Sequence, residues 1–132
     1  MPVSAAELAG IPLFASLGPA ELEEVAGWFD AKSASEGVRL AGESAVGYSF
    51  FVIADGNAVV TANGTAVATL GPGDFFGEIA ILGDGRRSAT VTTTRPARLF
   101  VMYGAEFRQL QERHPDVAAG LEAVMAARTA AT

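Results

Sequence analysis

The spacing of apolar residues changes twice along the chain and divides it into three segments. In the first segment, residues 1–29, apolar side chains follow Pro19 at intervals of three and four residues, the period of a helix that packs along one side. These positions are Leu22, Val25, Ala26 and Phe29. Glutamates fill the other side and favour a helix N-terminus. The segment is predicted to form helices that pack on the middle of the chain, with a short apolar connector from Ile11 to Leu17.

The middle segment, residues 30–102, consists of short β-forming runs separated by glycine. Ten of the fifteen glycines lie between Gly37 and Gly85. The predicted strands are Phe50–Ile53, Ala58–Ala62, Thr65–Leu70, Ser88–Thr93 and Ala97–Met102. Asp55-Gly56 and Asn63-Gly64 are two-residue hairpin signals, so tight turns are expected to join the first three strands. This spacing of strands and turns predicts an antiparallel β-roll or jelly-roll barrel.

The third segment, residues 104–128, returns to helical spacing. Phe107 and Leu110 lie on one side, and His114-Pro115 marks a break because the residue before proline avoids the helical region. A second apolar stripe follows at Val117, Leu121, Val124 and Met125. His114 is expected to be exposed and to have a structural role only. The whole chain is therefore predicted to be one domain, residues 1–132, of the α+β class, mainly β, with helices at both ends of the roll.

Composition excludes several classes of function. The 132 residues include no cysteine and one histidine, which excludes thiolate nucleophiles, Cys-ligated metals and the usual multi-histidine metal sites. A net charge of −6 argues against binding nucleic acid, whose phosphates require clustered lysine and arginine. No apolar run reaches the length of a membrane span and the N-terminus lacks the order of a signal peptide, so a cytoplasmic location is expected.

The charge is unevenly distributed. Residues 1–70 carry eight acidic and two basic residues, whereas residues 84–98 hold four arginines against Asp84 alone. The four are Arg86, Arg87, Arg95 and Arg98. This basic island is typical either of an ordinary solvated strand edge or of a site for a small anion.

Residues 71–91 carry the most specific chemistry. Glu78–Leu82, between Gly77 and Gly83, is a short helix-compatible stretch among strands. The first N–H groups of such a turn have no partner within the helix and form an anion cradle, to which Arg87 can add a two-pronged donor. The Glu78 carboxylate repels phosphate and is expected to face a sugar hydroxyl instead. A mononucleotide with a singly charged cyclic phosphate matches these groups without a metal ion.

The same residues carry a family resemblance. Phe76-Gly77-Glu78-Ile79-Ala80, then six residues, then Arg87-Ser88-Ala89-Thr90-Val91, resembles the phosphate-binding cassette of cyclic nucleotide-binding domains, here residues 76–91. These domains occur in cAMP-dependent kinase regulatory subunits, cyclic-nucleotide-gated channels and the cAMP receptor protein. The helical connector, the strand at Phe50–Ile53, the lead-in at Gly71–Asp74 and the tail at Phe107–Arg128 resemble the family as well.

The resemblance implies a ligand site made of Gly77, Glu78, Ile79, Ala80, Arg87, Ser88 and Ala89. It implies that Glu78 and the Gly77 backbone bind the ribose 2′-hydroxyl, and that Arg87 holds the cyclic phosphate with amides near Ala80, Ser88 and Ala89. It places Ser88 where a hydroxyl can help hold the purine of cGMP. Two features depart from the family: Arg86 stands where proline is frequent, and the closing helix is expected to be short and Ala-rich, without an aromatic residue to stack on the base.

The expected function is therefore a non-catalytic sensor of cAMP, favoured over cGMP, that relays occupancy through its C-terminal helices. The expected partners are the nucleotide and an effector domain or protein, with a homodimer left open and no cofactor or metal. One alternative is a degenerate, structural or dimerisation domain of the same fold without a ligand. Another is that Glu78 and Arg87 form only a surface ion pair. A third, a cupin-like enzyme, requires a histidine and carboxylate cluster that the sequence lacks.

Overall fold

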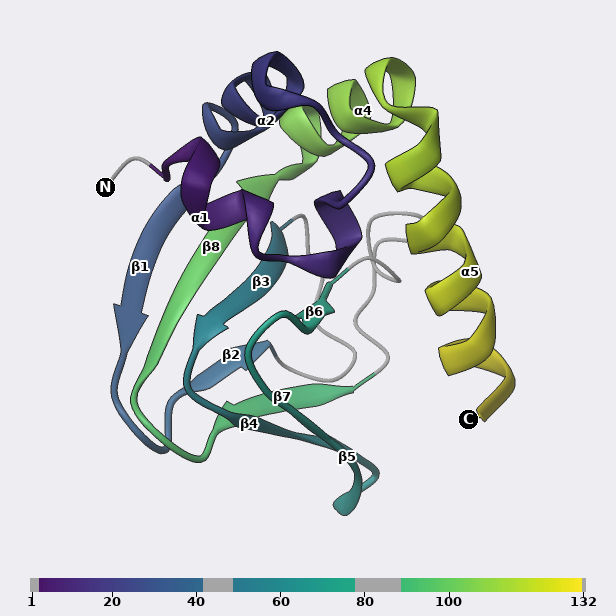
Figure 1. Ribbon diagram of the computed structural model, residues 1–132. Coiled ribbons are helices and arrows are strands. Elements are labelled where there is room, and N and C mark those ends of the chain that lie inside the picture. The colour runs from purple at the N-terminus through teal and green to yellow at the C-terminus, as the bar shows by residue number, and fades with distance from the viewer. Residues whose placement is uncertain (1–2, 42–48, 78–88, 132) are drawn as a thin grey trace.

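The computed structural model describes residues 3–41, 49–77 and 89–131. Its elements form three layers: helices from both ends of the chain, then one β-sheet, then a second β-sheet (Figure 1). The helices are α1 (Ala5–Ala9), the 3-10 helix η1 (Pro12–Phe14), α2 (Pro19–Ala26), α4 (Gly104–Arg113) and α5 (Pro115–Ala131). The strands are β1 (Asp30–Ala34), β2 (Arg39–Ala41), β3 (Ser49–Asp55), β4 (Ala58–Ala62), β5 (Thr65–Leu70), β6 (Phe75–Phe76), β7 (Thr90–Thr93) and β8 (Ala97–Tyr103).

The described strands form two four-stranded sheets. Sheet A has the order β1-β8-β3-β6 and sheet B the order β2-β7-β4-β5, and every neighbouring pair is antiparallel. Strands adjacent in sequence mostly lie apart in the sheets, as the crossovers of a β-roll require. The predicted fold class, a mainly β antiparallel roll with helices at both ends, is confirmed.

The predicted strands agree with the structure where the local pattern is strong. β4 and β5 have the predicted bounds, and β3 and β8 extend beyond them. β7 begins at Thr90, whereas the predicted strand begins at Ser88, which lies outside the described residues. Three strands, β1, β2 and β6, were not predicted because β1 is polar and small in composition and the other two are very short.

One of the two predicted hairpins is confirmed and the other is wrong. At Asn63-Gly64 both residues have positive φ, 54° and 77°, and Ala62 pairs with Thr65, as in a two-residue turn of this kind. The Asp55-Gly56 turn instead carries the chain from β3 in sheet A to β4 in sheet B. Gly56 has φ +96°, and an added Cβ would lie 2.4 Å from the Pro96 carbonyl oxygen. This glycine therefore permits a crossover rather than a hairpin.

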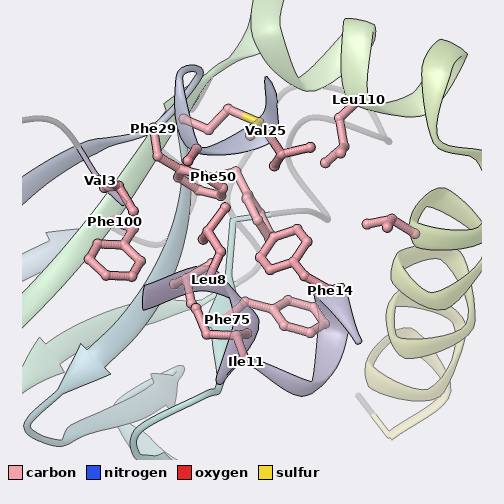
Figure 2. Close-up of a cluster of buried hydrophobic side chains, with 14 of the residues drawn as sticks. Val3, Leu8, Ile11, Phe14, Val25, Phe29, Phe50, Phe75, Phe100 and Leu110 are labelled. Atoms are coloured by element: carbon pink, nitrogen blue, oxygen red, sulfur yellow. The ribbon is translucent and has the colours of Figure 1, made fainter. Parts of the chain in front are cut away.

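Sheet A carries apolar side chains on both faces, which separate into two cores. Alternate residues of β3, β6 and β8 face the helices and form the helical-end core, shown in Figure 2. The intervening residues face sheet B and form the roll core. In β3, for example, Phe50 belongs to the helical-end core and Ile53 to the roll core. Successive side chains of a strand point to opposite faces of the sheet, and here the side chains on both faces are apolar.

The helices at the two ends of the chain pack together over sheet A (Figure 1). α2 begins at Pro19 as predicted, and α4 and α5 meet at the predicted break. The expectation of a short closing helix is wrong, since α5 has 17 residues. The expected exposure of His114 is wrong as well: this residue is only 6% exposed, because α2 packs against the α4–α5 junction and covers it. Local sequence spacing carries no signal of that contact between distant helices.

Candidate functional site

In the sequence, the predicted ligand site lies between β6 of sheet A and β7 of sheet B. Gly77 follows β6 and Ala89 precedes β7, and the structure describes both. The other predicted site residues, Glu78, Ile79, Ala80, Arg87 and Ser88, lie outside the described residues, as does the predicted helical turn at 78–82. The structure therefore defines how the site segment is anchored, and the chemistry within it rests on the sequence.

Gly77 is the point at which the chain leaves sheet A. It follows the edge strand β6 and has φ +99°, within the left-handed region that side-chain-bearing residues rarely adopt. The residue is half-buried. A glycine at this position of the predicted cassette is thus required by the backbone conformation itself.

A tight turn positions β6 ahead of Gly77. The Gly71 N–H donates to the Asp74 carboxylate at 2.8 Å, and the Asp74 N–H donates to the Gly71 carbonyl at 3.0 Å. On the β3 side, the Gly73 N–H donates to the Ile53 carbonyl at 2.8 Å, and the Ile53 N–H donates to the Asp74 carbonyl at 2.9 Å. The predicted lead-in, Gly71–Asp74, is therefore a hydrogen-bonded turn that attaches the site segment to β3.

The two phenylalanines of β6 fix the strand from both sides of sheet A. Phe75 contacts Phe50 in the helical-end core, with ring centroids 5.6 Å apart. Phe76 stacks on Phe51 on the opposite face, at 4.7 Å and an interplanar angle of 10°. Since Phe76 directly precedes Gly77, the start of the site segment is held by the stacking of buried Phe76 on half-buried Phe51.

The other end of the segment enters the middle of sheet B. Ala89 leads into β7, where Val91 pairs with Val60 of β4 on one side and with Ala41 of β2 on the other. Thr93, only 2% exposed, ends the strand; its hydroxyl donates to the Ser35 carbonyl at 2.6 Å and accepts from the Val38 N–H at 2.8 Å. One end of the site segment is thus anchored on sheet A and the other on sheet B.

On the β4 side of β7, the neighbouring strands β4 and β5 are uncharged, whereas β2 on the other side contains Arg39. No charged residue occurs in the sequence between Asp55 and Asp74, so β4, β5 and their turn carry no formal charge. In the sequence, residues 78–88 hold two acids and two arginines. A charged ligand would meet few competing fixed charges from β4 and β5.

The structure divides the predicted basic island. Arg98 forms an ion pair with Glu7 of α1, with Nη2 2.8 Å from Oε2. This hydrogen bond to Arg98 is the main reason why the pKa of Glu7 lies below its ordinary value, assisted by the Ser4 backbone. Arg95 is exposed in the turn between β7 and β8. The arginines left for an anion within the site segment are therefore Arg86 and Arg87.

A groove of about 520 Å³ lies elsewhere, between the N-terminal helices and the ends of β3 and β8. Its lining is largely apolar and includes Ile11, Pro12, Ile53 and Phe100. Three charged residues also line it: Glu7 and Arg98, which bind each other, and Asp55. Gly77 and Ala89, the predicted site residues that the structure describes, do not line this groove, and its described lining offers no unpaired cation for an anionic ligand.

Two negative findings concern the described residues only. Among them, no group of three or more histidine, aspartate or glutamate side chains is arranged to hold a metal ion. No helix in the described part of the chain is long and apolar enough to cross a membrane.

The fold and the anchored site segment define a cyclic nucleotide-binding domain. Residues 31–114 match the family model of that name, and the chain belongs to this family. A cyclic nucleotide-gated potassium channel of Mesorhizobium japonicum is 34% identical over 112 residues, which are 84% of this chain and 31% of the channel. The cyclic AMP receptor protein of Thermus thermophilus is 28% identical over 124 residues, 90% of this chain and 57% of the receptor.

A solved structure agrees with this assignment. The crystal structure of the Thermus thermophilus catabolite activator protein matches with a TM-score of 0.80 at 28% identity, covering 89% of this chain and 58% of that one. The resemblance inferred from the cassette is thus confirmed at the level of the family. The chain spans about a third of the channel and 57% of the receptor, so the activities of those whole proteins do not transfer with the domain.

Proposed function

We propose that the domain binds a cyclic mononucleotide, cAMP in preference to cGMP, as a regulatory ligand that it does not turn over. The observation that carries the proposal is the cassette between two anchored ends, with Gly77 at positive φ on sheet A and Ala89 at the entry to β7 on sheet B. The family match at residues 31–114 includes the whole segment.

Each site residue has a role that its chemistry supports. Arg87 holds the cyclic phosphate through a charge-assisted, two-pronged hydrogen bond, together with backbone amides near Ala80, Ser88 and Ala89. Glu78 and the Gly77 backbone bind the ribose 2′-hydroxyl, and Ile79 completes the helical turn. The strands β4 and β5 add no formal charge that would compete with these groups.

Binding without turnover is supported by the composition of the chain. The single histidine lies in the helical-end region, hydrogen-bonded to Glu24, and the chain has no cysteine. Hydrolysis of a phosphodiester commonly requires a metal ion or a positioned base beside the phosphate. The chemistry assigned to the cassette supplies hydrogen-bond donors and one carboxylate directed to the sugar.

We further propose that α4 and α5 relay occupancy. α4 packs on sheet A through Phe107, whose ring lies 5.2 Å from that of Phe50. α5 packs against η1, and its Val117 and Leu121 are buried. Phe50 also packs on Phe75 of β6, two residues before Gly77, so a short chain of ring contacts joins the start of the site segment to α4. A ligand that favours one arrangement of these rings would shift the helices.

Isothermal titration calorimetry with cAMP tests the binding proposal. Arg87→Ala should weaken binding by at least about 2 kcal/mol, roughly 30-fold in Kd, because a charge-assisted hydrogen bond to phosphate is lost. Arg95→Ala is the matched control: it removes an exposed arginine from the same basic island, outside the cassette, and should leave Kd within about twofold. Equal titration curves for wild type and Arg87→Ala would contradict the assignment of the phosphate site.

The alternative of a ligand-free domain makes a different prediction. If neither cAMP nor cGMP binds, the thermal unfolding curve stays unchanged at any nucleotide concentration, and a structural role is then favoured. If binding occurs, nucleotide at about 100 times its Kd should add about 2.7 kcal/mol to the free energy of unfolding. Comparing the two nucleotides in wild type and Ser88→Ala tests the preference: loss of the hydroxyl should weaken cGMP more than cAMP.

A further inference from the structure

The tight turn ahead of the predicted site segment is closed twice by Asp74. The Asp74 N–H donates to the Gly71 carbonyl at 3.0 Å, and the Asp74 carboxylate accepts from the Gly71 N–H at 2.8 Å. Pro72 and Gly73 occupy the two central positions, with Gly73 at φ +89°, as in a type II β-turn. Almost any residue at position 74 could make the backbone bond, whereas the second bond requires an acceptor in the side chain.

The same turn extends the short pairing of β6 with β3. β6 has only two residues and pairs with β3 at two positions. The Gly73 N–H donates to the Ile53 carbonyl at 2.8 Å, and the Ile53 N–H donates to the Asp74 carbonyl at 2.9 Å. These two bonds continue the contact between β3 and the chain that leads into β6. A turn that opens would therefore remove part of the backbone bonding that holds β6 on sheet A.

The position of β6 determines how the chain reaches the ligand site. Gly77, the first predicted site residue, follows β6 directly and lies three residues after Asp74. Phe75 and Phe76 are buried on opposite faces of sheet A. A slip of one residue along β3 would turn each ring to the wrong face. The bonds of the turn to Ile53 thus help to fix the register in which the chain arrives at Gly77.

The charge of Asp74 would act on an anionic ligand in the opposite direction to its hydrogen bond. Asp74 is exposed, and a negative charge near a phosphate site disfavours the binding of phosphate. Removing the charge alone should therefore strengthen the binding of a cyclic nucleotide or leave it unchanged. Weaker binding after loss of the carboxylate would point to the geometry of the turn and not to its charge.

We propose that Asp74 is a positioning residue for the nucleotide site: its carboxylate, bound to the Gly71 N–H, keeps the turn closed and so holds β6 and Gly77 in the arrangement that binds the ligand. This inference rests on the proposed function, because the site is the one assigned to the cyclic nucleotide. Without the carboxylate the backbone bonds remain, so the turn still forms but opens more often. The affinity for the ligand then falls with the fraction of molecules whose turn is closed.

The first test is calorimetric titration of cAMP into wild type and two variants of Asp74. Asp74→Ala should raise Kd about fivefold, the size of one exposed hydrogen bond. Asp74→Asn keeps an acceptor oxygen for the Gly71 N–H and should bind at least as tightly as wild type. Glu36→Ala is the matched control: it removes an exposed acid from the turn between β1 and β2 and should leave Kd within about twofold. The proposal is overturned if Asp74→Ala binds like wild type, or if Asp74→Asn binds as weakly as Asp74→Ala.

The second test measures amide hydrogen exchange by NMR without nucleotide. The N–H groups of Gly73 and Ile53 keep their own acceptors in Asp74→Ala, so faster exchange there reports opening of the turn. Both should exchange about fivefold faster than in wild type and in Asp74→Asn. Unchanged rates would overturn the proposal even if the affinity fell. A wild type that binds neither cAMP nor cGMP would refute the proposed function and with it the role in binding, while faster exchange in Asp74→Ala would still show that the carboxylate closes the turn.

Discussion

The two cores on either side of sheet A differ in the size of their side chains. The helical-end core contains six of the chain's eight phenylalanines, joined by edge and tilted ring contacts. The buried members of the roll core are mostly alanine, valine and leucine, with Phe76 as its buried aromatic ring. Large interlocking rings therefore hold the helices onto sheet A, while smaller side chains fill the space between the sheets.

The large rings of the helical-end core thus lie on one face of sheet A, and the predicted site segment is attached on the side of the roll core. The site segment is attached to the roll, at the end of β6 and the start of β7. The helices from both ends of the chain meet on the opposite face of sheet A. Among the described residues, neighbouring positions of β3, β6 and β8 belong to different cores, so these strands contact both regions.

The largest expected effect is the loss of a ring from the helical-end core. Phe50 is fully buried and contacts Phe29, Phe75 and Phe107. Phe50→Ala should reduce the free energy of unfolding by about 3–5 kcal/mol, because the cavity is bounded by rings that cannot collapse into it. Chemical denaturation measures the effect.

The neighbouring residue provides the comparison for that experiment. Phe51 is half-buried and stacks on Phe76 on the roll side of the sheet. Phe51→Ala should cost clearly less, about 1–3 kcal/mol, since less surface returns to water and the rim can adjust. If Phe51→Ala proved the more damaging change, the helical-end core would not be the main source of stability.

A pair of glycines tests the link between the two regions. Gly56 carries the chain from sheet A to sheet B, and Gly64 forms the β4–β5 hairpin; both have positive φ. Gly56→Ala should cost about 3–4 kcal/mol, from the strained φ together with the collision of its Cβ with the 96–97 backbone. Gly64→Ala, with no atom within 4 Å of the added carbon, should cost only the strain, about 1–2 kcal/mol. Thermal unfolding measures both variants. If the crossover were not tightly packed, the two variants would lose the same free energy of unfolding.

The elements with a strong local signal could be predicted from the sequence. The uncharged alternating runs of β4 and β5, the proline at the start of α2 and the break before Pro115 each act within a few residues. The pairing of β3 could not be predicted in this way. Asp55-Gly56 has the composition of a hairpin, but the chain crosses to the other sheet there, and the close backbone contact that requires glycine is with Pro96, forty residues away.

The candidate site shows the same limit. The residue types and spacing of the cassette predicted the family, because a phosphate site requires a short set of groups close in sequence. The burial of His114 and the pairing of Arg98 with Glu7 depend on contacts between residues about 90 positions apart. Sequence spacing therefore placed Arg98 in a basic island typical of either a solvated strand edge or an anion site, and it placed His114 on the surface. Both residues instead join the N-terminal helices to later elements.

The smallest expected effect concerns that Glu7–Arg98 pair, which attaches α1 to β8 at the rim of the helical-end core. Arg98 lowers the pKa of Glu7 mainly through a hydrogen bond, so the pair stabilises the fold while Glu7 is ionised. The contribution is complete above the ordinary glutamate value of 4.5 and is lost as the pH falls through the lower value of the folded state. Glu7→Gln should therefore lower the urea midpoint slightly near neutral pH and make no difference in strong acid.

A matched variant separates this pair from a general effect of charge. Glu23→Gln removes one negative charge from an exposed position of α2 and should give the same difference from wild type at both pH values. If Glu7→Gln behaved like Glu23→Gln across the acid range, the ion pair would contribute nothing measurable. The packing of α1 would then rest on its buried Leu8 and on the rings beneath it, and the rim of the helical end would owe its stability to apolar contacts alone.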